Sequence, residues 1–179
     1  MTKVAVIVGS LREASLNKKF AHAFIAHASE GIEFVYADID LPLYNGDLEA
    51  SAYPEKAQAL KDLIKSCNSV LVVTPEYNRG YPGVLKNAID WISRPDSTEV
   101  LNNKPVVLAG VSGSALGTTQ SQSQLRNVLI YLNTKLMGQP EAYINGGRFF
   151  TESGEVVEES KEWLQRYVDA AVAHLSSSN

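Results

Sequence analysis

The stretch VAVIVGSLREASLN, residues 4–17, places an unbroken apolar run directly before a polar loop. Five apolar residues from Val4 to Val8 are typical of a strand that is buried on both faces of a sheet. After the loop, large apolar residues recur every four positions from Leu16 to Phe24, which predicts a helix over residues 15–28. A buried strand followed by an amphipathic helix is the repeating unit of parallel α/β sheets.

The same alternation of strand and helix continues along the chain. Further strands are predicted over residues 33–39, 69–74, 105–111 and 141–144, and further helices over 54–65, 82–92, 118–136 and 156–175, with a long loop over 40–53. Because crossovers between parallel strands are right-handed, these elements wind into a sheet with helices on both faces. We therefore predict one α/β domain over residues 1–179, built on a doubly wound five-stranded parallel sheet in the order 2-1-3-4-5.

The composition excludes several classes of function. Hydrophobic residues make up 45% of the 179 residues and charged residues 20%, the balance of an ordinary soluble protein. The formal net charge of −4 argues against nucleic-acid binding, which needs clustered Lys and Arg. A single cysteine, Cys67, forms no disulfide within the chain, and the histidines lack metal-ligand spacing. With neither a secretory signal nor a span-length apolar run, we predict a cytoplasmic protein that binds no metal and no membrane.

The predicted sheet indicates where a ligand binds. In doubly wound sheets, ligands lie beyond the carboxyl ends of the strands, at the point where the strand order reverses. A ligand is therefore expected at the loops that follow Val8, Thr74 and Val111.

The first loop carries donors suited to a phosphate. Ser10, Ser15 and Asn17 offer neutral donors, and the start of the following helix offers free backbone N–H groups at its positive end. Arg12 adds a permanent charge whose forked donors match phosphate oxygens. The alternative interpretation is that Ser15 is only a helix N-cap and Arg12 a solvated loop charge.

Two common nucleotide motifs are absent from this loop. No Gly-Lys-Ser/Thr follows Gly9, so it is not a Walker A motif, and Leu11 and Ala14 occupy the glycine positions of a dinucleotide fingerprint. The loop therefore favours a phosphate of the mononucleotide type.

The second loop, PEYNRGYPG over residues 75–83, has two prolines and two glycines in nine residues. That content predicts a fixed backbone, able to present N–H and C=O groups to a planar ring. Tyr77 and Tyr81 add flat surfaces that could flank such a ring. A plainer interpretation is a stiff loop whose tyrosines cover the core, with Glu76 an ordinary surface charge.

The third loop, residues 110–120, is rich in small residues that let the backbone approach a ligand closely. It also nearly matches the Gly-x-Ser-x-Gly nucleophile elbow of hydrolases, but Ser114 stands at the last glycine position. Asp169 and His174, the candidate triad partners, are predicted to share one helix, which is poor geometry for a triad.

The first loop together with the run PEYNRGYPGVLKNAIDW, residues 75–91, resembles the NADPH-dependent FMN reductase family. That family includes quinone, chromate and azo-dye reductases with a flavodoxin-like fold, and the resemblance covers nearly the whole chain in element order. It implies that the first loop holds the FMN phosphate, that the second lines the isoalloxazine ring chiefly through backbone groups, and that the third contacts the flavin from its other edge. The FMN-binding residues so implied are Ser10, Arg12, Ser15, Leu16, Asn17, Pro75, Glu76, Tyr77, Asn78, Ser112 and Gly113.

The resemblance also implies an activity. NADPH or NADH would pass hydride to bound FMN, which then reduces a quinone, azo compound, metal oxyanion or free flavin, and no side chain is required as a catalytic group. The alternative is a flavodoxin-type electron carrier without nicotinamide reactivity, although such carriers tend to be more acidic than −4. A homodimer or homotetramer is expected, with apolar area from the helices that carry Trp91 and Tyr131.

One segment departs from the family pattern. Many relatives carry Gly-Gly-x-Arg in the third loop, where this chain has Gly117-Thr118-Thr119-Gln120. The missing arginine leaves the preference between NADPH and NADH open, and the sequence does not decide whether Arg126, six residues further along, compensates for it.

Overall fold

A computed structural model describes residues 1–95 and 100–177 of the chain. The strands are β1 (Thr2–Val8), β2 (Ile32–Tyr36), β3 (Ser69–Val73), β4 (Pro105–Ser112), β5 (Lys135–Leu136) and β6 (Ala142–Asn145). The helices are α1 (Leu16–His27), α2 (Gly46–Ser51), α3 (Glu55–Ser66), α4 (Gly83–Ile92), α5 (Thr119–Tyr131), α6 (Gly146–Phe149) and α7 (Glu158–Leu175). Helices therefore separate most successive strands, as a parallel sheet requires.

The sheet is parallel throughout and has the order β2-β1-β3-β4-β5, with β6 also paired to β4. This confirms the predicted order, and the strand reversal lies between β1 and β3. The number of strands was predicted wrongly, because the fifth position is shared by two strands. Val106 pairs with both β3 and β5, and Ala109 with both β3 and β6, so β5 and β6 lie in succession along the same edge of β4.

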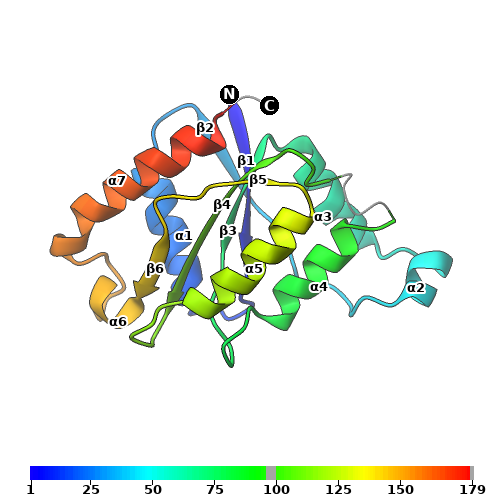
Figure 1. The fold of residues 1–179 in the computed structure, drawn as a ribbon, viewed down its shortest axis with the longest axis horizontal. Coiled ribbons are helices and arrows are strands. Elements are labelled where there is room, and N and C mark those ends of the chain that lie inside the picture. The colour runs from blue at the N-terminus through cyan, green and yellow to red at the C-terminus, as the bar shows by residue number, and fades with distance from the viewer. Residues whose placement is uncertain (96–99, 178–179) are drawn as a thin grey trace.

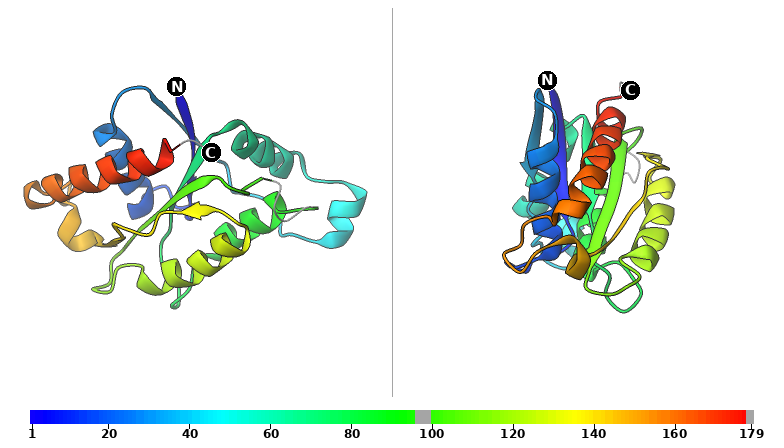
Figure 2. Two further views of the ribbon diagram at one scale, coloured as in Figure 1. Left: turned by 45° about the horizontal axis from the view of Figure 1, so that its top comes forward. Right: turned by 90° about the vertical axis from the view of Figure 1, so that its left-hand side faces the viewer.

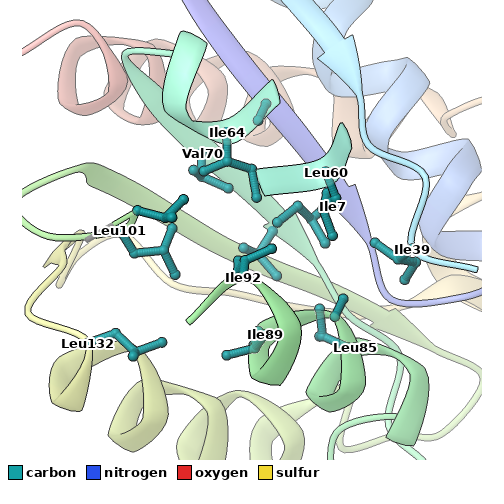
Figure 3. Close-up of a cluster of buried hydrophobic side chains, with 14 of the residues drawn as sticks. Ile7, Ile39, Leu60, Ile64, Val70, Leu85, Ile89, Ile92, Leu101 and Leu132 are labelled. Carbon is teal, nitrogen blue, oxygen red and sulfur yellow. The ribbon is translucent and has the colours of Figure 1, made fainter. Parts of the chain in front are cut away.

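Helices cover both faces of the sheet (Figure 1), and alternate residues of the central strands belong to the two opposite core clusters. Val4 and Val6 of β1 join the cluster under α1 and α7, whereas Ala5 and Ile7 join the cluster under α3, α4 and α5. Figure 3 shows this second cluster, in which Ile7 lies among side chains from α3 and α4. Burial on both faces explains why the strands read as continuous apolar runs.

The predicted helix over 118–136 ends too late. The helix α5 stops at Tyr131, and Asn133 adopts a left-handed φ of 56°. The N–H of Asn133 then bonds the carbonyl of Ile130, and that of Thr134 bonds the carbonyl of Leu129, which is a Schellman ending. The turn frees the following residues to form β5.

Other boundaries also differ from the sequence predictions. The second strand ends at Tyr36, three residues early, because the Asp38 carboxylate accepts the backbone N–H of Asp40 and turns the chain. The long loop over 40–53 contains the short helix α2, whose N-cap Asn45 accepts the N–H of Asp47. Figure 2 shows that α2 lies at one end of the molecule, away from the sheet. In the described part of the chain, no helix is both long and apolar enough to cross a membrane.

Candidate functional site

Three loops meet at the carboxyl ends of β1, β3 and β4 and enclose a pocket of about 160 Å³. The lining residues are Ser10, Arg12, Ser15, Leu16, Asn17, Pro75, Glu76, Tyr77, Val111, Ser112 and Gly113. Ten of the eleven residues implied by the resemblance thus come together here. Asn78 does not line the pocket, and Val111 was missed.

The first loop ends at the start of α1 with Ser15 as N-cap. Ser15 is buried, and its hydroxyl oxygen accepts the N–H groups of Asn17 and Lys18 at 3.2 and 3.4 Å. Within residues 1–95 and 100–177, the backbone N–H groups of Leu11 to Ala14 meet no hydrogen-bond acceptor. No acidic residue occupies the first turn of α1, so its positive end is not neutralised by its own helix.

Asn17 connects two of the three loops. Its side-chain amide nitrogen donates to the carbonyl of Val111, and its side-chain oxygen accepts the N–H of Val111, both at 2.9 Å. Both residues are buried. The side chain that the resemblance assigned to the phosphate therefore holds the end of β4 beside the first loop, with one amide hydrogen to spare.

The second loop contains a tight turn from Tyr77 to Gly80. The two residues exchange backbone hydrogen bonds of 2.9 and 3.0 Å, and the central Asn78 and Arg79 have φ values of 51° and 66°. Positive φ at both central positions defines a type I′ turn, in which asparagine is favoured first. Asn78 lies at the exposed tip of this turn, which explains why it does not line the pocket.

The start of this loop is fixed by α5. The carbonyl of Pro75 accepts the hydroxyls of Thr74 and Ser121, at 2.9 and 2.8 Å. One carboxylate oxygen of Glu76 accepts the N–H groups of Gln120 and Ser121, at 2.9 and 3.1 Å. Glu76 therefore caps α5, which has no side-chain cap of its own, and its negative charge faces the positive helix end.

The third loop leaves space open at the pocket. A Cβ placed on Gly113 would meet no atom within 4 Å, so a ligand can approach its backbone. The Ser112 hydroxyl donates to the carbonyl of Gly117 and also accepts the N–H of Ser114, so it stabilises the loop itself. Gly117 has a φ of 61°, and a Cβ there would come within 2.7 Å of the Tyr143 backbone, so only glycine fits.

The donor set fits FMN. Free backbone N–H groups, the Ser10 and Ser15 hydroxyls and the Arg12 guanidinium gather at a helix start, as a phosphate requires. Glu76 is the only carboxylate among the described lining residues, and its negative charge interacts with the positive N-terminal end of α5. The pocket therefore presents donors to an anionic group and does not oppose it with a free negative charge.

The comparison with known proteins decides the family. The model of the family described as NADPH-dependent FMN reductase matches residues 2–148. The chain belongs to this family. A 2-hydroxy-1,4-benzoquinone reductase of a Burkholderia species is 45% identical over 174 residues, covering 96% of this chain and 94% of that protein. A quinone reductase of Pseudomonas putida is 42% identical over 168 residues, covering 93% and 90%.

A solved structure agrees with these relatives. FerB, a flavoenzyme NAD(P)H:(acceptor) oxidoreductase of Paracoccus denitrificans, matches with a TM-score of 0.89 and 42% identity, covering 98% of this chain and 97% of that one. As a member of the FMN reductase family, the chain is a flavin-dependent oxidoreductase with FMN as cofactor and NAD(P)H as electron donor. The flavodoxin-type carrier is accordingly the weaker interpretation.

Several candidates from the sequence lie outside this FMN reductase site. Arg126 forms an ion pair with Glu141 at 3.2 Å and donates to the Met137 carbonyl, so it does not replace the arginine missing at Gln120. Trp91 is fully buried and donates to the Pro42 carbonyl, so it is a core residue and its own side chain adds no apolar area to the surface of α4.

The hydrolase alternative and a redox cysteine also lack support from geometry. Asp169 and His174 both lie on α7. Asp169 accepts the side-chain amide of Gln165, and His174 contacts the Lys135 carbonyl, so within the described residues neither is bonded to Ser112. Cys67 is buried, and desolvation raises the pKa of its thiol, so little reactive thiolate forms near neutral pH.

Proposed function

We propose that this protein is a quinone reductase that binds FMN between the three loops and passes electrons from NADPH or NADH to a small quinone. The observation that carries the proposal is the pocket itself, where ten residues from distant parts of the sequence converge at the reversal of strand order. The names of the Burkholderia and Pseudomonas putida relatives favour a quinone over an azo compound, a metal oxyanion or free flavin as acceptor.

The loops would divide the work of holding FMN. Backbone N–H groups of the first loop, with Arg12 and the hydroxyls of Ser10 and Ser15, bind the phosphate. Pro75 to Tyr77 and the open backbone at Gly113 border the flavin ring. When bound, FMN supplies the hydride and electron transfer chemistry, and the protein contributes position and electrostatics.

The small size of the pocket supports a larger assembly. Pockets that enclose a small molecule usually measure about 300–1,000 Å³, so about 160 Å³ encloses only part of FMN. Leu11, Tyr77 and Leu116, one from each of the three loops, are about half exposed, and Tyr77 lines the pocket. We infer that bound flavin and a second copy of the chain cover these side chains in a cytoplasmic homodimer or homotetramer.

Flavin titration tests the site. Substituting Arg12→Ala removes a charge-assisted phosphate contact, so the affinity for FMN should fall by about tenfold to a hundredfold. Affinity for riboflavin, which has no phosphate, should stay within about twofold. Arg166→Ala is the control, because Arg166 pairs with Glu162 on α7 outside the site. An equal effect of Arg12→Ala on FMN and riboflavin would contradict the assigned role.

A further inference from the structure

A second and larger pocket lies on the other side of the first loop. It has a volume of about 410 Å³, within the usual range for small-molecule sites. Its lining residues are Val8, Ser10, Leu11, Lys18, His22, Tyr36, Ala37, Asp38, Ile39 and Asp40. We call it the β2 pocket, since it lies at the carboxyl ends of β1 and β2, and the FMN site described above does not use it.

The β2 pocket combines an aromatic surface with an apolar floor. Tyr36 is 42% exposed, and its hydroxyl lies 3.2 Å from Nδ1 of His22, with the two rings 5.4 Å apart. This contact fixes the tyrosine ring at the pocket. Val8 and Ile39 are buried beneath. Such a surface suits a flat heteroaromatic ring, which stacks on tyrosine with little sequence or substituent preference.

The charges of the β2 pocket are arranged unevenly. Lys18, from the first turn of α1, forms no ion pair within the described chain and can approach a phosphate. Asp38 is already engaged, because it accepts the Asp40 N–H at 2.9 Å and pairs with Lys56 at 3.1 Å. Within residues 1–95 and 100–177, the Asp40 carboxylate accepts no hydrogen bond, so it can act as an acceptor for sugar hydroxyls.

Ser10 lines both the β2 pocket and the FMN site. A phosphate held by the first loop therefore lies at the boundary between the two pockets. A ligand that continues beyond that phosphate has its next group beside Lys18, and a base and sugar further on can reach Tyr36 and Asp40. This order of phosphate, sugar and base is that of a nucleoside monophosphate.

We propose that the β2 pocket binds an adenylate group, so that the protein accepts FAD as well as FMN. In FAD an adenylate is joined directly to the flavin phosphate, which places it at the shared boundary formed by Ser10. The same adenylate chemistry occurs in the NAD(P)H donor, which is the other source of the group. The inference rests on the proposed FMN site, because it requires that the first loop binds the flavin phosphate.

Flavin titration of the flavin-free full-length protein tests this inference. We expect wild-type protein to bind FAD no more than about tenfold more weakly than FMN. Tyr36→Ala removes the stacking surface, so FAD affinity should fall about tenfold or more while FMN affinity changes by less than about twofold. NADP⁺ is titrated in parallel into the FMN-loaded wild type and variant by calorimetry, which identifies the donor as the source if its affinity falls instead.

Two adjacent lysines supply a matched control that does not depend on Tyr36. Lys18 lines the β2 pocket, whereas Lys19 does not. Lys18→Gln should weaken FAD more than Lys19→Gln does, and this pair decides the matter if Tyr36→Ala fails to fold. Unchanged FAD and NADP⁺ affinities in both pocket variants would overturn the adenylate site. A wild type that binds no FMN would instead overturn the proposed function.

Discussion

Asn17 stabilises the site through backbone contacts and not only through any ligand that it meets. Its side chain satisfies both the N–H and the carbonyl of Val111, across ninety-four positions of sequence. Buried backbone groups need such partners, because leaving one unpaired costs about 1–3 kcal/mol. The loop at the carboxyl end of β4 therefore depends on a residue of α1.

We predict that Asn17→Ala lowers the free energy of unfolding by about 2–4 kcal/mol, since two backbone groups lose their partner. Urea denaturation of the flavin-free protein measures the change. Asn68→Ala is the control, because the Asn68 side chain accepts the Lys3 N–H at an exposed position. A loss for Asn17→Ala no larger than that for Asn68→Ala would show that the connection contributes little.

Glu76 acts on α5 across the second loop. Its carboxylate accepts two of the N–H groups that the helix start leaves unpaired. Removing such a cap costs about 0.5–2 kcal/mol. The family resemblance implied that Glu76 contacts the flavin. The sequence did not predict that Glu76 caps α5, because Gln120 and Ser121 are forty-four and forty-five positions away.

Glu76→Ala should therefore destabilise the protein by about 1–2 kcal/mol, and Glu76→Gln by roughly half as much, because its amide oxygen still accepts. Thermal unfolding of the two variants gives the ranking. If both the alanine and the glutamine variant are as stable as the wild type, the cap that Glu76 forms on α5 does not contribute to stability.

At the scale of elements, the sequence predicted what depends on local periodicity. Apolar runs and helical periodicity identified every long helix and every strand except β5, because burial on both sheet faces leaves a direct signal, while the handedness of crossovers predicted the strand order. The end of α5 at Tyr131 and the short helix α2 were not predicted, because neither the left-handed Asn133 that follows α5 nor a six-residue helix leaves a periodic pattern. Asn78 was also placed wrongly at the pocket, because the type I′ turn that carries it to an exposed tip was not predicted from the sequence.

The long loop over residues 40–53, called the arm below, is bonded to α4 through the side chain of Asn87. The Asn87 side-chain oxygen accepts the Tyr44 N–H at 2.7 Å, and its amide donates to the Pro42 carbonyl at 2.9 Å. Trp91, one turn further, also donates to Pro42 at 2.8 Å. The sequence run that carried the family resemblance therefore also positions the arm.

Asn87→Ala should free the arm without unfolding the sheet. We expect hydrogen exchange to quicken at Tyr44, whose N–H loses its acceptor, while exchange in β1 and β3 stays unchanged. The loss in stability should be about 1–3 kcal/mol. Faster exchange spread evenly over the whole chain would contradict a local fastening.

At the scale of the whole molecule, we propose that residues 1–179 form one domain. Both core clusters share the same strands, so neither layer of helices can lose its packing alone. Ile130 and Tyr131, at the end of α5 away from the pocket, are 65% and 73% exposed, and we propose them as a second contact between copies of the chain, beside the one over the pocket.

Placing a charge on this surface tests the assembly. Tyr131→Glu should shift the molecular mass in solution toward that of a monomer, because an unpaired carboxylate is costly in an apolar interface. Size-exclusion chromatography with light scattering measures the mass. Ser153→Glu, an exposed position in the loop before α7, should leave it unchanged. An unaltered mass in the Tyr131 variant would exclude this end of α5 as the contact.

The central claim is that this chain uses FMN to carry electrons from a nicotinamide to a quinone. The most direct test is anaerobic mixing of the FMN-loaded protein with NADPH, and separately with NADH, while the visible absorbance of the flavin is followed. We expect at least one donor to bleach the flavin and added quinone to restore its colour. A flavin that binds but stays oxidised with both donors would contradict the account and leave an electron carrier of the flavodoxin type.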